Sequence, residues 1–152
     1  MRELRGRPQG TGFRVAIVAS RYNEMLVRQM IDGAHDTLLE AGVKEEDIVL
    51  VRVPGAFELP AAARRLADTG QLHAIVVLGV VLRGETYHFE VVAQSCAQGI
   101  QQIALGAKVG FGFCVLTVDT IEQGLAPAGL KENKGKEAAE TALEMARLLT
   151  TI

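Results

Sequence analysis

A short segment, Arg83-Gly84-Glu85-Thr86-Tyr87-His88, brings together the side chains best suited to chemistry in this sequence. With Gly79 it has the spacing of a nucleotide P-loop, G-x4-G-K-S/T, but Glu85 replaces the lysine and would repel a triphosphate. The glycine, the N–H groups at a helix start and the Thr86 hydroxyl can still hold one phosphate group. The pattern excludes an NTPase and leaves open a single-phosphate site or a purely structural turn.

His88 stands at the expected start of the helix that follows this segment. Because a helix N-terminus disfavours a charged imidazolium, we expect a neutral ring that passes protons near pH 7, although a solvated surface histidine fits equally well. His35 and His73 are predicted to be structural or solvated. The three histidines have no Cys or carboxylate at ligand spacing, so no metal site is expected. Gly110-Phe111-Gly112 lacks a third glycine and precedes a strand, so NAD and FAD are unsupported.

Other loops add polar and aromatic groups. Glu58 follows Phe57 directly after a Pro54-Gly55 turn. An acidic side chain in the first turn of a helix interacts favourably with the helix dipole, and this alone could explain Glu58. Glu58 is equally suited to accept hydrogen bonds from a polyol or an amine of a ligand. A basic cluster before the last helix forms a solvated face or an anion contact, and comprises Lys131, Lys134 and Lys136. Aromatic side chains in or beside the loops favour a planar ring ligand, and these are Tyr22, Phe57, Tyr87 and Phe89.

Four runs rich in β-branched residues must position these loops, and each run is nearly continuous in apolar residues, as in strands buried on both faces. They span residues 14–19, 48–53, 74–82 and 113–118. Helical patterns occupy residues 27–38, with Gly42 at the C-terminal cap, and residues 58–68 and 88–105. Asp119 with Glu122 predicts the start of a short helix that Pro127 stops, and Asn133 is expected to cap a last helix.

Strict alternation of strands and helices predicts a parallel sheet with right-handed crossovers. We expect residues 1–152 to form one domain, with an extended N-terminal arm over residues 1–12. Its fold class is α/β, a three-layer α/β/α sandwich of flavodoxin-like outline with a four-stranded parallel sheet. Ligands bind beyond the carboxyl ends of such strands, which is where the loops described above lie.

Composition excludes several functional classes. The chain has 152 residues, with 16 Lys plus Arg against 18 Asp plus Glu, and lacks the basic footprint of a nucleic-acid-binding protein. Its longest apolar run, at 74–82, is too short for a membrane span, and no secretory signal is expected. Cys96 and Cys114 fall outside any CxxC pattern and fit a reducing cytosol, so we expect a cytoplasmic protein. Hydrophobic residues reach 49% without Trp, an aliphatic excess that we attribute to subunit interfaces.

Several motifs in combination resemble one enzyme family. They are Val53-Pro-Gly-Ala-Phe-Glu-Leu-Pro60, Arg83-Gly-x-Thr-x-His-Phe89, Thr120-Ile-Glu-Gln123, Ala128-Gly129 with Asn133-Lys-Gly135, and Ala142-Leu-Glu-Met145. From about Thr11 to the end of the last helix, the chain resembles 6,7-dimethyl-8-ribityllumazine synthase of riboflavin biosynthesis. The resemblance implies a transferase without cofactor. It would condense two small-molecule substrates, 5-amino-6-(ribitylamino)uracil and 3,4-dihydroxy-2-butanone 4-phosphate, releasing phosphate and water.

The same resemblance implies roles for individual residues. For the pyrimidine ring it implies stacking by Tyr22 and backbone contacts from Val80, Val81 and Leu82. For the ribityl chain it implies contacts from Ala56, Phe57 and Glu58. For the phosphate it implies Glu85 and Thr86, and for proton transfer His88. Phe113 would come from a neighbouring subunit, because members form homopentamers, and many assemble further into decamers or sixty-subunit icosahedral shells. The N-terminal arm would extend the sheet of the next subunit, and riboflavin synthase is an implied partner.

Departures from the family pattern keep other functions open. Pro127 stands where the family places an Arg that grips the substrate phosphate, and Lys131 or Lys134 is a candidate to compensate. The loop after Gly129 is one residue shorter than in many relatives, which favours a closed shell, and Cys114 replaces a glycine. One alternative is a catalytically weakened paralogue that binds flavin or forms a shell. Another is an FMN electron carrier, which the glycine-free loop after the first strand disfavours.

Overall fold

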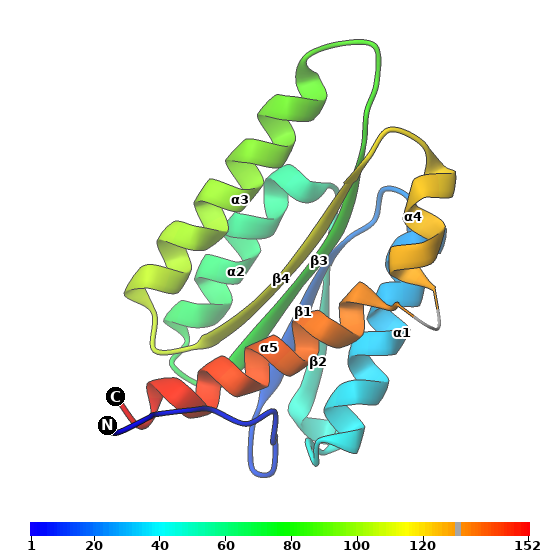
Figure 1. Cartoon of the computed structure of the whole chain (residues 1–152). Coiled ribbons are helices and arrows are strands. Elements are labelled where there is room, and N and C mark those ends of the chain that lie inside the picture. Colours follow the sequence, from blue (N-terminus) through cyan, green and yellow to red (C-terminus); the bar gives the residue numbers. More distant parts are fainter. Residues whose placement is uncertain (130–131) are drawn as a thin grey trace.

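A parallel sheet forms the centre of the computed structural model, which describes residues 1–129 and 132–152 (Figure 1). The sheet has the order β2-β1-β3-β4, and every neighbouring pair is parallel. Its strands are β1 (Val15–Ser20), β2 (Ile48–Val53), β3 (Ala74–Leu82) and β4 (Gly110–Val118). The two inner strands, β1 and β3, are buried along almost their whole length, which explains their unbroken apolar runs.

Helices cover both faces of this sheet (Figure 1). One face carries α1 (Glu24–Glu40), α4 (Ile121–Ala128) and α5 (Lys134–Leu149), and the other carries α2 (Leu59–Asp68) and α3 (His88–Gly106). Two short 3-10 turns, Glu45–Asp47 and Ala56–Glu58, precede β2 and α2. Side chains of β3 alternate between the two cores: Val76 packs toward α1 and α5, and Val77 toward α2 and α3. The predicted flavodoxin-like α/β/α sandwich with a four-stranded parallel sheet is confirmed.

Strand β4 begins three residues earlier than the sequence predicted, at Gly110 instead of Phe113. Glycines are poor strand formers, but here they allow α5 to lie directly on the strand. A β-carbon on Gly110 would come within 2.3 Å of the Ala142 carbonyl oxygen, and one on Gly112 within 1.8 Å of the Ala138 carbonyl oxygen. Phe113 therefore lies inside the strand and does not open it.

Helix α4 also differs from the prediction at both of its ends. Thr120, not Asp119, caps it: the Thr120 hydroxyl accepts the Gln123 N–H at 3.3 Å, and Gln123 Oε1 accepts the Asp119 N–H at 2.7 Å. Pro127 lies within the last turn instead of stopping the helix before it. Its ring fits the helical φ and costs only one late hydrogen bond, so the helix continues to Ala128.

Asn133 caps α5, as predicted, by accepting the Lys136 N–H at 3.1 Å. Its side-chain amide also donates to the Gln29 carbonyl at 2.9 Å and to the Ala128 carbonyl at 3.2 Å. One side chain thus joins the start of α5 to α1 and to the end of α4. Gly42 follows the C-cap of α1 with a left-handed φ of 96°, which agrees with its predicted capping role.

The N-terminal segment runs beside the C-terminal half of α5 (Figure 1). Arg147 of α5 donates to the carbonyls of Gln9 and Thr11, each at 3.0 Å, and its guanidinium lies 4.0 Å from the centre of the Phe13 ring. His73 stacks on the same ring, with ring centres 4.8 Å apart. His73 therefore has a structural role, as predicted. Within the described ranges, no helix is long and apolar enough to cross a membrane.

Candidate active site

An open cavity of about 610 Å³ lies where β1, β2 and β3 end, at the edge of the sheet where the strand order predicts a ligand. This volume suits a small organic molecule. Most of the predicted site residues line the cavity: Tyr22, Ala56, Phe57, Glu58, Val80, Val81, Leu82, Thr86 and His88. The structure therefore brings together loops that are far apart in the sequence.

Two exposed aromatic rings form part of the cavity wall. Tyr22 is 67% exposed and comes from the loop after β1, and Phe57 is 59% exposed and comes from the loop after β2. The face of an exposed aromatic ring can stack on another flat ring. Two such rings beside one cavity are suited to a flat heterocyclic ligand.

Glu58 stabilises the turn that carries Phe57. Its Oε2 accepts the Gly55 N–H at 2.9 Å, so it acts as the first-turn acid that the sequence suggested. The same side chain lines the cavity. Contact with a polyol or an amine is compatible with this arrangement, and it remains a prediction.

Asn23 lines the cavity and was missed by sequence reasoning. It has a left-handed backbone conformation, with φ 60° and ψ 49°, which asparagine tolerates better than most residues. Its side-chain amide donates to the Val80 carbonyl at 3.3 Å and so ties the β1 loop to the end of β3. An asparagine directly before a helix was the available signal, but its partner carbonyl is 57 residues away.

The first turn of α3 contributes the remaining wall. Residues 82–88 are all exposed, and His88 begins the helix. The Thr86 hydroxyl accepts the His88 N–H at 3.4 Å. The sequence placed Phe89 among the aromatic residues expected beside a planar ligand, but it did not assign Val91 or Val92 to the site. All three line the cavity and make this side of it apolar. A hydroxyl and an imidazole therefore face the same space as the aromatic rings.

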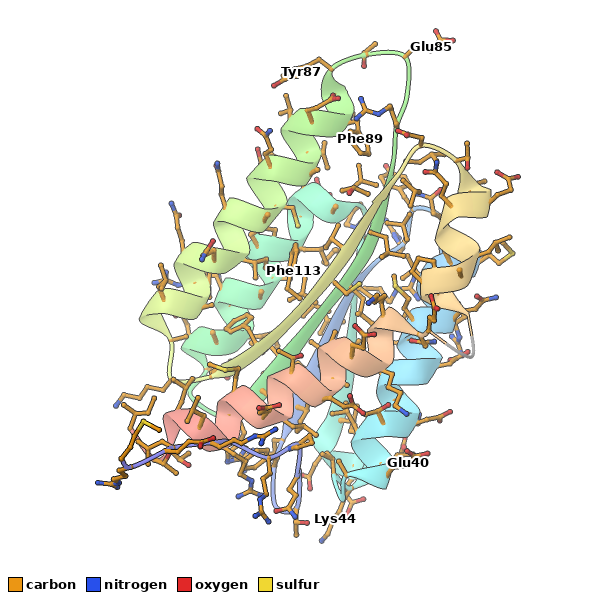
Figure 2. All side chains as sticks on the ribbon, in the orientation of Figure 1. Glu40, Lys44, Glu85, Tyr87, Phe89 and Phe113 are labelled. Atoms are coloured by element: carbon orange, nitrogen blue, oxygen red, sulfur yellow. The ribbon has the colours of Figure 1, made fainter. Side chains whose placement is uncertain are left out.

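Three predicted site residues do not line this cavity. Glu85 lies at the apex of the loop between β3 and α3 (Figure 2). Phe113 is 42% exposed on β4 and pairs with Val77, three residues before the cavity begins at Val80. Lys134, at the start of α5, forms an ion pair with Glu137 at 2.8 Å, and this carboxylate raises the pKa of the Lys134 ammonium group. Lys131 lies outside the described residues.

Metal ligands are not grouped in the part of the chain that the structure describes. Across residues 1–129 and 132–152, no three His, Cys, Asp or Glu side chains are placed to hold a metal ion. His35 instead contacts Glu45, with Nε2 and Oε2 2.7 Å apart.

Comparison with known proteins gives one consistent result. The family model described as 6,7-dimethyl-8-ribityllumazine synthase matches residues 12–150. A protein of that name from Halorhodospira halophila is 50% identical over 137 residues, which cover 90% of this chain and 88% of the relative. Another from Kosmotoga olearia is 48% identical over 149 residues, covering 97% and 96% of the two chains. The chain therefore belongs to the 6,7-dimethyl-8-ribityllumazine synthase family.

Proposed function

We propose that this chain condenses 5-amino-6-(D-ribitylamino)uracil with 3,4-dihydroxy-2-butanone 4-phosphate to form 6,7-dimethyl-8-ribityllumazine, with release of phosphate and water. This transferase reaction is the penultimate step of riboflavin biosynthesis. Family membership supports the reaction, and one observation about the cavity supports its location. Exposed aromatic rings and the Thr86–His88 pair line the same open space.

The pyrimidine substrate takes the aromatic side of the cavity. Tyr22 stacks on its ring, and the main chain of residues 80–82 contacts the uracil edge. Ala56, Phe57 and Glu58 hold the ribityl chain. All of these residues line the cavity, and the bond from Glu58 to the Gly55 N–H holds the turn in place.

The four-carbon substrate binds at the start of α3. Its phosphate accepts hydrogen bonds from the main-chain N–H groups of Glu85 and Thr86 and from the Thr86 hydroxyl, and the positive end of the α3 dipole favours an anion there. The Glu85 side chain lies at the apex of the loop (Figure 2), so the role proposed for this residue falls to its backbone N–H and not to its carboxylate. His88 moves protons at the reacting centre.

The chemistry consists of imine formation between the 5-amino group and the ketone, phosphate elimination, ring closure and dehydration. No step requires a covalent bond to the enzyme. Holding two reactants in register is worth ~7–11 kcal/mol, whereas an acid–base group typically contributes ~10²- to 10⁴-fold. Positioning by the cavity is therefore expected to outweigh any single side chain.

A neighbouring subunit completes the site in a homopentamer, and pentamers assemble into a larger shell. Phe113 and Lys134 are the residues that it contributes. Support comes from the open mouth of the cavity and from the position of both residues on or beside the edge strand β4, away from the cavity of their own chain. Riboflavin synthase is the partner that consumes the product. Two unpaired cysteines suit action in the cytoplasm.

The shared site is tested by mixing two variants that are each expected to have reduced activity. His88→Ala and Phe113→Ala chains are unfolded together and refolded as mixed oligomers. Recovery of part of the wild-type activity is expected, because some sites then combine His88 from one chain with Phe113 from another. Each variant refolded alone is the control. If the mixture is no more active than its components while the chains are shown to co-assemble, the two-chain site is wrong.

The proposed reaction itself is tested with purified protein and both substrates. The fluorescence of the lumazine product is followed against a protein-free control. Acceleration over the control is expected from wild type, and a larger effect from Pro127→Arg. No acceleration by either protein would contradict the function.

A further inference from the structure

Arg83 stands at the base of the exposed loop that carries Thr86 and His88. It directly follows β3, and its main-chain N–H donates to the Val118 carbonyl at 2.8 Å, which continues the β3–β4 pairing by one residue. Residues 84–88 beyond it are all exposed. Burial therefore does not explain what keeps the Thr86 hydroxyl and the His88 ring beside the cavity.

The Arg83 side chain connects the two ends of this loop to β4. Its Nε donates to Asp119 Oδ1 at 2.7 Å, just beyond β4, and its Nη1 donates to Glu90 Oε1 in the first turn of α3. The guanidinium carbon also lies 4.4 Å from the centre of the Phe89 ring. Figure 2 shows Phe89 beneath the loop, whose apex is at Glu85. One planar group thus joins the residue after β4 to the first turn of α3, next to the cavity wall at Phe89.

Charge strengthens this arrangement. A main-chain hydrogen bond and the Arg83 guanidinium lower the pKa of Glu90, and Glu90 and Asp119 raise the pKa of Arg83. The Glu90 carboxylate and the Arg83 guanidinium are therefore both ionised near neutral pH. The second Glu90 oxygen, Oε2, is buried and has no hydrogen-bond partner among the described residues. Arg83 is thus the main counter-charge for a partly buried carboxylate at the start of α3.

We propose that Arg83 is a positioning residue for the reaction: its guanidinium bridges Asp119 and Glu90, stacks on Phe89, and so sets where Thr86 and His88 lie in the cavity. This inference rests on the proposed function. Lysine cannot replace Arg83, because a compact ammonium group offers neither the two-directional fork nor a flat face to stack on Phe89.

The two substrates should respond differently to loss of this bridge. Tyr22 and Phe57 belong to the loops after β1 and β2, and residues 80–82 are held by main-chain pairing of β3 with β4. Binding of the pyrimidine is therefore expected to depend little on Arg83. Thr86 and His88 belong to the loop that Arg83 spans, so binding of the butanone phosphate and proton transfer do depend on it. A general loss of stability would instead weaken the binding of both substrates to a similar extent.

The test compares Arg83→Lys with a matched control, Arg64→Lys. Arg64 also donates through Nε to a carboxylate, Asp68 at 2.9 Å, but on α2 and outside the cavity. Because small misplacements of reacting groups slow reactions strongly, Arg83→Lys is expected to raise KM for the butanone phosphate and lower kcat, each about tenfold. KM for the pyrimidine and all constants of Arg64→Lys are expected to stay near wild type.

Amide hydrogen exchange of residues 84–91 is measured on the same proteins and does not require activity. Faster exchange is expected in Arg83→Lys but not in Arg64→Lys. A smaller increase is expected in Glu90→Gln, which keeps the arginine but weakens one end of the bridge. Glu90→Gln also decides the question if Arg83→Lys fails to fold. Unchanged exchange, an unchanged KM for the butanone phosphate, or an equal rise in both KM values would overturn the proposal. An inactive wild type would instead refute the proposed reaction, and the exchange result would still decide whether Arg83 holds the loop.

Discussion

The ring of Tyr22 lies so close to Gly55 that a β-carbon on this glycine would come within 2.9 Å of two ring carbons, Cδ2 and Cε2. Gly55 has an extended backbone, with φ −140° and ψ −178°, which any residue can adopt. The site therefore needs glycine here for space and not for backbone conformation. This contact determines how the β1 loop and the β2 loop together form the aromatic side of the cavity.

Gly55→Ala is expected to displace the Tyr22 ring and weaken binding of the pyrimidine. We expect KM for that substrate to rise about tenfold, equivalent to ~1.4 kcal/mol, with little change for the butanone phosphate. Steady-state kinetics with each substrate varied in turn measures the effect. Gly106→Ala is the control, because a β-carbon there meets nothing within 4 Å. Equal effects of the two substitutions would argue against the contact.

His88→Ala is expected to slow turnover without abolishing it. An acid–base group contributes ~10²- to 10⁴-fold, so kcat should fall by no more than this, and product formation should stay faster than without protein. KM for the pyrimidine should change little, because its stacking residues come from other loops. Product fluorescence over long incubations checks the remaining rate. Complete loss of activity in a correctly assembled protein would contradict this role.

Pro127→Arg is expected to improve use of the butanone phosphate. A charged hydrogen bond to phosphate is worth ~1.5–3 kcal/mol, so KM should fall roughly ten- to a hundredfold. Pro127→Ala is the matched control, because it removes the ring from the last turn of α4 without adding a charge. If alanine lowers KM as much as arginine does, the change comes from the helix and not from the guanidinium.

Asn133→Ala is expected to lower the free energy of unfolding by about 2–3 kcal/mol, because it removes one helix cap and two bonds to carbonyls of other helices. Urea unfolding measures the change. Asn133→Asp keeps the acceptor for the Lys136 N–H and loses both donated bonds, so an intermediate loss is expected. A full loss in the aspartate variant would show that the cap itself contributes nothing.

Thiol reactivity should follow burial. Burial raises the pKa of Cys96 and of Cys114 to about 11 each, so both thiols stay protonated in the folded protein at neutral pH. The neutral thiol is favoured by folding. Its stabilising contribution is therefore fully present below the unfolded thiol pKa of ~8.5 and is lost as pH rises toward 11.

Ellman's reagent measures this prediction. Slow reaction of the native protein at pH 8 and complete reaction in denaturant are expected, with Cys114→Ser isolating the signal of Cys96. Rapid native reaction of both thiols would show that they are accessible.

Local patterns were sufficient to predict most of the fold. Unbroken apolar runs identified the buried strands β1 and β3, and Asn133 and Gly42 marked helix ends because their capping bonds are local. The start of β4 could not be predicted from strand preference, because Gly110 and Gly112 serve the contact with α5, a helix that follows later in the chain.

The residues of the candidate site that lie in loops directly after strands could be predicted from the sequence. Tyr22, Phe57 and His88 all lie in loops after strands, and the parallel order brings these loops together. Asn23 was missed because its bond to the Val80 carbonyl is tertiary. Likewise, the bridge from Arg83 to Asp119 joins two strand ends, and the sequence instead suggested Asp119 as a helix cap.

The most direct measurement determines both products of one reaction with wild-type protein. 5-Amino-6-(D-ribitylamino)uracil and 3,4-dihydroxy-2-butanone 4-phosphate are mixed with the enzyme, and lumazine and inorganic phosphate are measured together over time. Both products should form in equal amounts, faster than in the protein-free mixture, and the acceleration should fall sharply in Phe57→Ala. Equal rates with and without protein, or acceleration that Phe57→Ala leaves unchanged, would show that this cavity is not the active site.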